Sequence, residues 1–200
     1  MKITTKQIAV TGILLAICIV SQFFKNLSVF ITGPIINACL IIAVLTAGLA
    51  CGIILSIITP ITAFIITGSP VMSAVPAMIP MVMLGNAILV VFVWLLYKKI
   101  NNSINKDIRL CMGMIVGSVV KAAVMGLTIS LWLLPTFLPQ PMQEKMLPAL
   151  QAQFSTVQLI TALIGSALAF AIWLPLRKYL SATDSDSGKK DDKNSDSRVI

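Results

Sequence analysis

Lys121 is the residue whose type and position most need a chemical explanation. It lies inside the apolar run of residues 110–136. A lysine near the middle of a membrane-spanning helix costs roughly 2.5–3.5 kcal/mol on insertion scales, so it normally faces a partner or a water-filled cavity. Acidic residues occur only in the flanking segments, at Asp107 and Glu144, and after residue 183. We therefore expect the counter-charge of Lys121 to arrive with a ligand.

Two other arrangements would accommodate this ammonium group without a ligand. Lys121 can donate hydrogen bonds to backbone carbonyls and waters, or its flexible stem can carry the charge toward one membrane surface. The sequence leaves both alternatives open.

Other polar residues lie at comparable depth on neighbouring apolar segments. At a rise of roughly 1.5 Å per residue, Asn86 lies about 15 Å below the outer start of its helix and Lys121 about 18 Å above the inner start of its own. In a hydrocarbon core about 30 Å thick these depths are similar, and Asn37, Gln158 and Thr161 are expected nearer the outer surface. The predicted ligand contacts are Lys121, Asn86, Asn37, Gln158, Thr161 and Trp132. Met81, Met83, Met125, Trp132 and Phe154 are the residues expected to form the apolar wall.

This distribution predicts a cavity that opens outward and is closed inward. The inner halves of the fourth and sixth apolar segments are nearly all apolar, whereas a pore needs polar residues along its whole length. The sequence contains no histidine, and its four cysteines occur singly, without metal-binding spacing. With no intramembrane carboxylate and no histidine to activate a serine, we expect neither an enzyme nor a bound cofactor or metal.

The composition is that of an integral membrane protein. The 200 residues are 58% hydrophobic and 11% charged, with a mean hydropathy of +0.97. A net charge of +8 does not indicate nucleic-acid binding, because the basic residues cluster at the ends of apolar segments. The pattern predicts an all-α protein with a transmembrane domain over residues 1–180. Its six helices are expected at about 8–24, 34–50, 52–67, 76–97, 110–136 and 157–176.

Several local signals refine these helices. Pro34 suits the first turn of the second helix, and the short segment 48–52 allows only a tight turn before the third. Thr59-Pro60 predicts a kink whose freed carbonyl is met by hydroxyls or neighbouring helices.

Residues 142–154 form a mildly amphipathic piece that could lie across the mouth of the bundle. Residues 181–200, rich in Ser, Asp and Lys, are predicted to be a disordered polar cytoplasmic tail.

The distribution of basic residues predicts the orientation. Six spans place both termini on the same side of the membrane. Eight Lys and Arg residues near span ends fall on that side, namely Lys2, Lys6, Lys98, Lys99, Lys106, Arg109, Arg177 and Lys178, against Lys25 and Lys145 on the other. Both termini are therefore predicted to be cytoplasmic.

The first helix carries a strip of small residues, Ala9, Gly12 and Ala16, which we call the α-strip. Such a strip lets another helix approach closely. It is either a docking surface for a partner protein or a site of ordinary packing within the bundle, and the sequence does not decide between them.

The chain resembles the substrate-binding S components of energy-coupling factor (ECF) vitamin transporters over roughly residues 4–180. The stretches that carry the resemblance are the start at residues 4–16, Gly33-Pro34, residues 83–87 and the region 117–121, together with length and six spans. The resemblance implies a multi-pass protein of a prokaryotic plasma membrane that binds a vitamin-like small molecule from outside with high affinity.

The resemblance also implies partners. The ligand would be delivered inward by toppling in a complex with a transmembrane coupling (T) protein and two ATPase subunits, and this chain has no phosphate-binding loop of its own. The family's Ala-xxx-Ala contact corresponds here to Gly12 and Ala16, with Ala9 one turn earlier. A lone cation favours a carboxylated substrate, whereas a flavin or thiamin precursor stays possible. The alternative functions are a stand-alone secondary carrier and a membrane scaffold.

Overall fold

The computed structural model describes residues 4–24, 28–99 and 105–196, with side chains described up to residue 180. The described residues contain helices and short connections and no strand. The chain forms two compact units, Met1–Ala169 and Phe170–Ile200. Lys2 and Lys25, which were counted for the orientation, lie outside the described residues. Asn102, between the fourth and fifth predicted helices, lies outside them as well.

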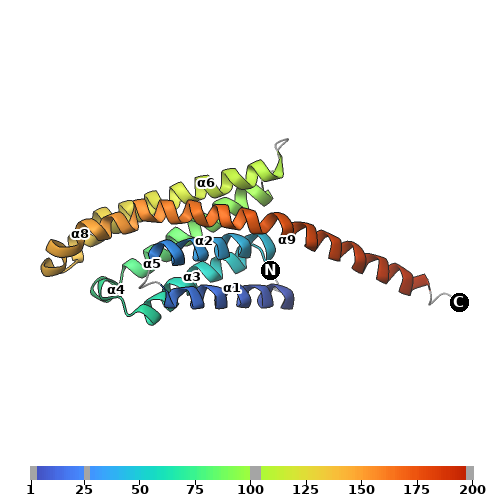
Figure 1. Ribbon diagram of the computed structural model, residues 1–200, viewed down its shortest axis with the longest axis horizontal. Coiled ribbons are helices and arrows are strands. Elements are labelled where there is room, and N and C mark those ends of the chain that lie inside the picture. Colours follow the sequence, from blue (N-terminus) through green and yellow to red (C-terminus); the bar gives the residue numbers. More distant parts are fainter. Residues whose placement is uncertain (1–3, 25–27, 100–104, 197–200) are drawn as a thin grey trace. The chain divides into compact units, whose positions relative to one another are not determined.

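The first unit contains most of the helices (Figure 1). These are α1 (Thr5–Phe23), α2 (Val29–Thr46), α3 (Leu49–Thr67), α4 (Pro70–Ala74), α5 (Met78–Trp94), η1 (Leu95–Lys99), α6 (Lys106–Met125), η2 (Gly126–Leu133), α7 (Leu134–Phe137), α8 (Gln140–Phe154) and the first part of α9 (Thr156–Asp196). The two segments labelled η are π-helical turns that continue α5 and α6. The second unit is the continuation of α9, with Pro175 inside the helix.

Six helical stretches in the described ranges are long and apolar enough to cross a membrane, which confirms the predicted all-α fold with six spans. They are Thr5–Phe23, Val29–Thr46, Leu49–Thr67, Met78–Lys99, Lys106–Phe137 and Gln140–Leu180. The contacts of the first unit join α1, α2 and α3 to one another, α5 to α2 and α3, and α6 to α5. The predicted cytoplasmic location of the termini stays a prediction.

The second helix begins earlier than predicted. Ser28 is the N-cap and accepts a hydrogen bond from the backbone N–H of Phe30 at 3.2 Å, so α2 starts at Val29 and Pro34 lies inside the helix. The prediction of Pro34 as a first-turn residue was therefore wrong. The sequence 29–31 is apolar and follows a serine cap, which favours a helix start before the proline.

The tight turn between α2 and α3 is confirmed. Gly48 has a φ of +93°, a conformation that side chains with a Cβ rarely adopt. Gln7 of α1 donates a hydrogen bond to the carbonyl of Ala47 at 2.8 Å, which ties α1 to this turn. Gln7 also completes a capping box with Thr4 at the start of α1.

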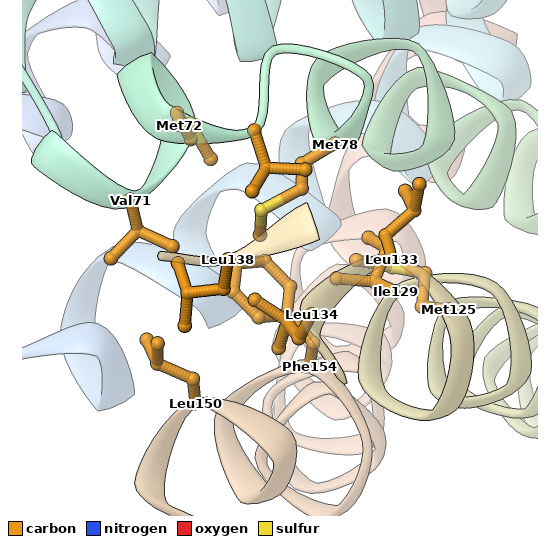
Figure 2. Packing of buried hydrophobic residues seen from close by; sticks show 11 residues of the cluster. Val71, Met72, Met78, Met125, Ile129, Leu133, Leu134, Leu138, Leu150 and Phe154 are labelled. Carbon is orange, nitrogen blue, oxygen red and sulfur yellow. The ribbon is translucent and has the colours of Figure 1, made fainter. Parts of the chain in front are cut away.

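The amphipathic piece predicted between the fifth and sixth spans is helix α8. In Figure 1, α8 and α4 lie at the same end of the first unit, away from the start of α1. A buried apolar cluster joins them to α5, α6, η2 and α7 (Figure 2). Its residues are Val71, Met72, Val75, Met78, Met125, Ile129, Leu133, Leu134, Leu138, Leu150 and Phe154. Two of its members, Met72 and Phe154, also line the cavity described below.

The helix α9 is continuous from Thr156 to Asp196, so it extends through most of the segment 181–200. The predicted disorder of that segment in solution stays a prediction.

Candidate functional site

Three buried polar residues from three helices form one hydrogen-bonded cluster, which we call the polar triad. Lys121 Nζ on α6 donates to Asn37 Oδ1 on α2 at 2.6 Å and to Asn86 Oδ1 on α5 at 2.8 Å. The exposed fractions of Lys121, Asn37 and Asn86 are 2%, 2% and 4%. The three positions are far apart in sequence, and the helix packing brings them to one point.

Small residues on α6 set the position of Lys121 against α5. A Cβ added at Gly117 would lie 3.2 Å from the carbonyl oxygen of Leu89, and one added at Gly113 would lie 3.2 Å from the Cα of Val93. The two helices therefore approach closely only because these positions lack a side chain. Since Gly113, Gly117 and Lys121 are spaced by four residues, they share one helix face, and Lys121 is directed at the helix that carries Asn86.

A second close approach fixes Asn37. A Cβ added at Gly165 of α9 would lie 2.7 Å from both the carbonyl oxygen of Pro34 and the Cβ of Asn37. One added at Gly33 would lie 2.9 Å from the Cβ of Thr161. The packing of α9 on α2 thus holds the face of α2 that supplies Asn37.

Asn37 was expected nearer the outer surface than Lys121, and this relative depth in the membrane stays a prediction, although their side chains meet in a hydrogen bond. The expected depth of Asn37 was counted from a helix start at Pro34. With α2 beginning at Val29, Asn37 lies about 12 Å along the helix, at a rise of roughly 1.5 Å per residue.

The ammonium group of Lys121 is solvated by neutral partners. An ammonium has three N–H donors, and in the described structure two of them are used by carboxamide oxygens. These dipoles stabilise the positive charge without neutralising it. The side chain is buried, and its two partners are side-chain amides rather than the backbone carbonyls considered from the sequence.

The polar triad forms part of the wall of a cavity whose free volume is about 90 Å³ for water-sized molecules. Gln158 of α9 also lines it, which brings four of the predicted ligand contacts together. The complete lining is Val29, Thr32, Gly33, Ile36, Asn37, Thr59, Pro60, Ala63, Met72, Val82, Asn86, Lys121, Gln153, Phe154 and Gln158. The wall is mostly apolar with a few convergent polar groups, as is usual for small-molecule sites.

Two predicted contacts lie elsewhere. Thr161 is buried behind the lining and donates a hydrogen bond to the carbonyl of its own helix at Val157, at 2.8 Å. Trp132 lies on η2 with 56% of its side chain exposed and is not a lining residue. Of the predicted apolar wall, Phe154 lines the cavity and also belongs to the buried apolar cluster, whereas Met125 belongs to the cluster and is not a lining residue.

The sequence reasoning did not find the contribution of α3 and of the first turns of α2. Thr59, Pro60 and Ala63 line the cavity, as do Val29 and Thr32. The Thr59-Pro60 pair was recognised only as a kink. The Thr59 carbonyl accepts hydrogen bonds from Gln22 Nε2 at 3.0 Å and Thr62 Oγ1 at 3.1 Å. The carbonyl that Pro60 leaves without its helical partner is that of Ser56, so the predicted kink stays a prediction.

The residue types of the site favour an organic ligand over a metal ion. A lysine and two carboxamides are hydrogen-bonding groups, and in the described ranges no three His, Cys, Asp or Glu side chains gather closely enough to hold a metal.

The α-strip on α1 is uncovered in the described structure. Ala9, Gly12 and Ala16 are all exposed, and a Cβ added at Gly12 would meet no atom within 4 Å. Ordinary packing within this chain therefore does not account for the small residues of the strip.

The family model for the substrate-specific component of ECF transporters matches residues 6–177. The chain belongs to this family. It is accordingly a multi-pass membrane protein and the substrate-binding subunit of a transporter, not an enzyme, as predicted. Comparison with curated proteins and with solved structures gives no match.

Proposed function

We propose that this S component binds a small anionic vitamin or related molecule in the cavity at Lys121. The observation that supports this is a buried ammonium group in a cavity wall whose hydrogen-bonded partners are two neutral amides. A buried charge of this kind is stabilised further by an opposite charge, and a carboxylate supplies both the charge and acceptor oxygens. Carboxylated vitamins such as nicotinate, pantothenate, biotin or folate have this chemistry.

The rest of the site suits the same class of ligand. Asn86, Asn37 and Gln158 provide amide donors and acceptors, and Phe154, Val82 and Met72 provide apolar contact area. A neutral flavin or thiamin precursor would use the apolar wall and the amides but would leave the charge of Lys121 without a counter-ion.

We further propose that ligand release into the cytoplasm requires a T protein and two ATPase subunits in a prokaryotic plasma membrane. The chain has no phosphate-binding loop, so ATP hydrolysis has to come from other subunits. The uncovered α-strip on α1 is the surface proposed to dock on the T protein, since small residues allow close approach of another helix.

Reconstitution separates this proposal from a stand-alone carrier. Purified protein should bind a carboxylated vitamin tightly, yet liposomes containing it alone should not accumulate that vitamin. ATP-dependent uptake should begin when the T protein and both ATPases are included. Uptake by the chain alone, driven by a proton or sodium gradient, would instead establish a secondary carrier.

The identity of the ligand is best measured by native mass spectrometry of the protein purified from its own host. An anionic compound of vitamin size is the expected finding. A neutral compound at full occupancy would contradict the anion proposal while leaving the binding role in place.

A further inference from the structure

Thr59 has a buried hydroxyl group that the polar triad does not use. The residue is 1% exposed and lines the cavity. Within the part of the chain that the structure describes, its Oγ1 has no hydrogen-bond partner. A buried polar atom without a partner costs stability, and so its presence in a cavity wall calls for a reason.

Other hydroxyl groups on the same helix behave differently. Ser56 Oγ donates to the carbonyl of Gly52 at 2.8 Å, and Thr67 Oγ1 donates to that of Ala63 at 2.7 Å. Such bonds to a carbonyl one turn earlier are the usual way for serine and threonine to be satisfied in an apolar helix. The Thr59 hydroxyl does not take this option and is left able to donate to another group.

Gln22 of α1 is hydrogen-bonded to the backbone of Thr59. Its Nε2 donates to the Thr59 carbonyl at 3.0 Å, while its Oε1 is buried and also lacks a partner. Gln22 is not a cavity-lining residue. The amide oxygen of Gln22 does not accept a hydrogen bond from the Thr59 hydroxyl in the described structure, which leaves a ligand in the cavity as the acceptor to test.

We propose that the Thr59 hydroxyl donates a hydrogen bond to the bound ligand, as a second polar contact supplied by α3. The substrate class is then narrower than a simple anion. It carries an anionic group for Lys121 and a separate hydrogen-bond acceptor, such as a carbonyl, hydroxyl or ring nitrogen, for Thr59. This inference rests on the proposed function, because it concerns the same cavity.

The first test measures the hydroxyl without any ligand. Thr59→Val keeps the shape and removes the unpaired polar group, so the melting temperature of ligand-free protein in detergent should rise by about 2–4 °C. Thr67→Val is the matched control on the same helix and should lower it, because a formed hydrogen bond is lost. A lowered melting temperature in Thr59→Val would show that the hydroxyl is satisfied within the protein, by Gln22 or otherwise, and would overturn the proposal.

The second test measures binding with nicotinate, pantothenate and biotin as probes, each of which has a carboxylate and a separate acceptor. For the tightest probe, Thr59→Val should weaken affinity by about three- to tenfold, the worth of one hydrogen bond, and Thr59→Ser should restore most of it. Thr67→Val should bind as the wild type does.

The outcomes separate the two proposals. If the wild type binds a probe and Thr59→Val binds it with the same affinity, the Thr59 contact is overturned. The anion site stays intact in that case. If the ligand-free wild type binds neither these three carboxylates nor folate, the anionic substrate class fails, and the Thr59 contact proposed for it fails as well.

Discussion

At the scale of single residues, the site is governed by a charge that the protein solvates but does not neutralise. Hydrogen bonds from Lys121 to Asn37 and Asn86 offset part of the cost of burying an ammonium group. A carboxylate in place of either asparagine would have offset more, and would have competed with an anionic ligand. The two amides thus leave Lys121 without a carboxylate partner in the described residues, which the proposed anionic ligand would supply.

Replacement of Lys121 by methionine tests this directly. Lys121→Met keeps the volume and removes the charge, so affinity for an anionic ligand should fall by about 2–5 kcal/mol, the worth of a buried charge-assisted contact. The control is Lys106→Met, on the same helix but at an exposed position, which should bind normally. Titration calorimetry of the folded variants gives the comparison, and wild-type affinity in Lys121→Met would remove the anion argument.

The sequence was sufficient to select Lys121, Asn86, Asn37 and Gln158, which line one cavity, because charged and amide side chains in apolar helices are few. It was not sufficient to find Thr59. A threonine in a membrane helix usually bonds to its own backbone, and only the three-dimensional contacts show that this one does not. Trp132 was chosen for its position along the chain, but the face of η2 on which it lies depends on the local π-helical geometry.

At the scale of helices, the number and type of elements followed from length and hydropathy, whereas their ends depended on local caps. Ser28 and not Pro34 determines where α2 starts, so Asn37 lies five residues further along the helix than the sequence predicted. The helix pairings were not predictable, because they depend on which small residues face one another. Gly165 against Asn37 and Gly117 against Leu89 are such pairs.

The α2–α9 contact should be intolerant of a single added methyl group. In Gly165→Ala the new Cβ would lie 2.7 Å from the Pro34 carbonyl oxygen, so the two helices have to separate. We expect a loss of about 1–3 kcal/mol of stability and weaker ligand binding, because Asn37 moves with its helix. Gly12→Ala introduces the same methyl group at an open position on α1 and should leave the melting temperature unchanged or slightly raised, since alanine favours the helix more than glycine does. Equal melting temperatures for the two variants would contradict the packing described here.

At the scale of the whole molecule, the orientation in the membrane decides from which side the ligand enters. The excess of basic residues predicts that both termini and the segment around Asn102 face the cytoplasm, and that α8 with Lys145 faces outward. In a background without the four native cysteines, an impermeant thiol reagent added to intact cells should label Lys145→Cys and not Asn102→Cys. The reverse pattern would place the cavity on the inner side and contradict capture from outside.

Binding and assembly should be separable, because they are assigned to different surfaces of the same protein. Ala16 is exposed on α1, whereas the polar triad is buried among α2, α5 and α6. Ala16→Leu fills the α-strip with a larger side chain and should prevent close approach of a T-protein helix while the cavity is unchanged. The variant should therefore bind ligand with wild-type affinity, but less of it should be recovered with the T protein and ATPases, and ATP-dependent uptake should fall.

Lys121→Met should give the opposite pattern, with normal complex recovery and weak binding. If Ala16→Leu assembles and transports normally, the docking surface lies elsewhere on the protein, and the small residues of α1 face lipid.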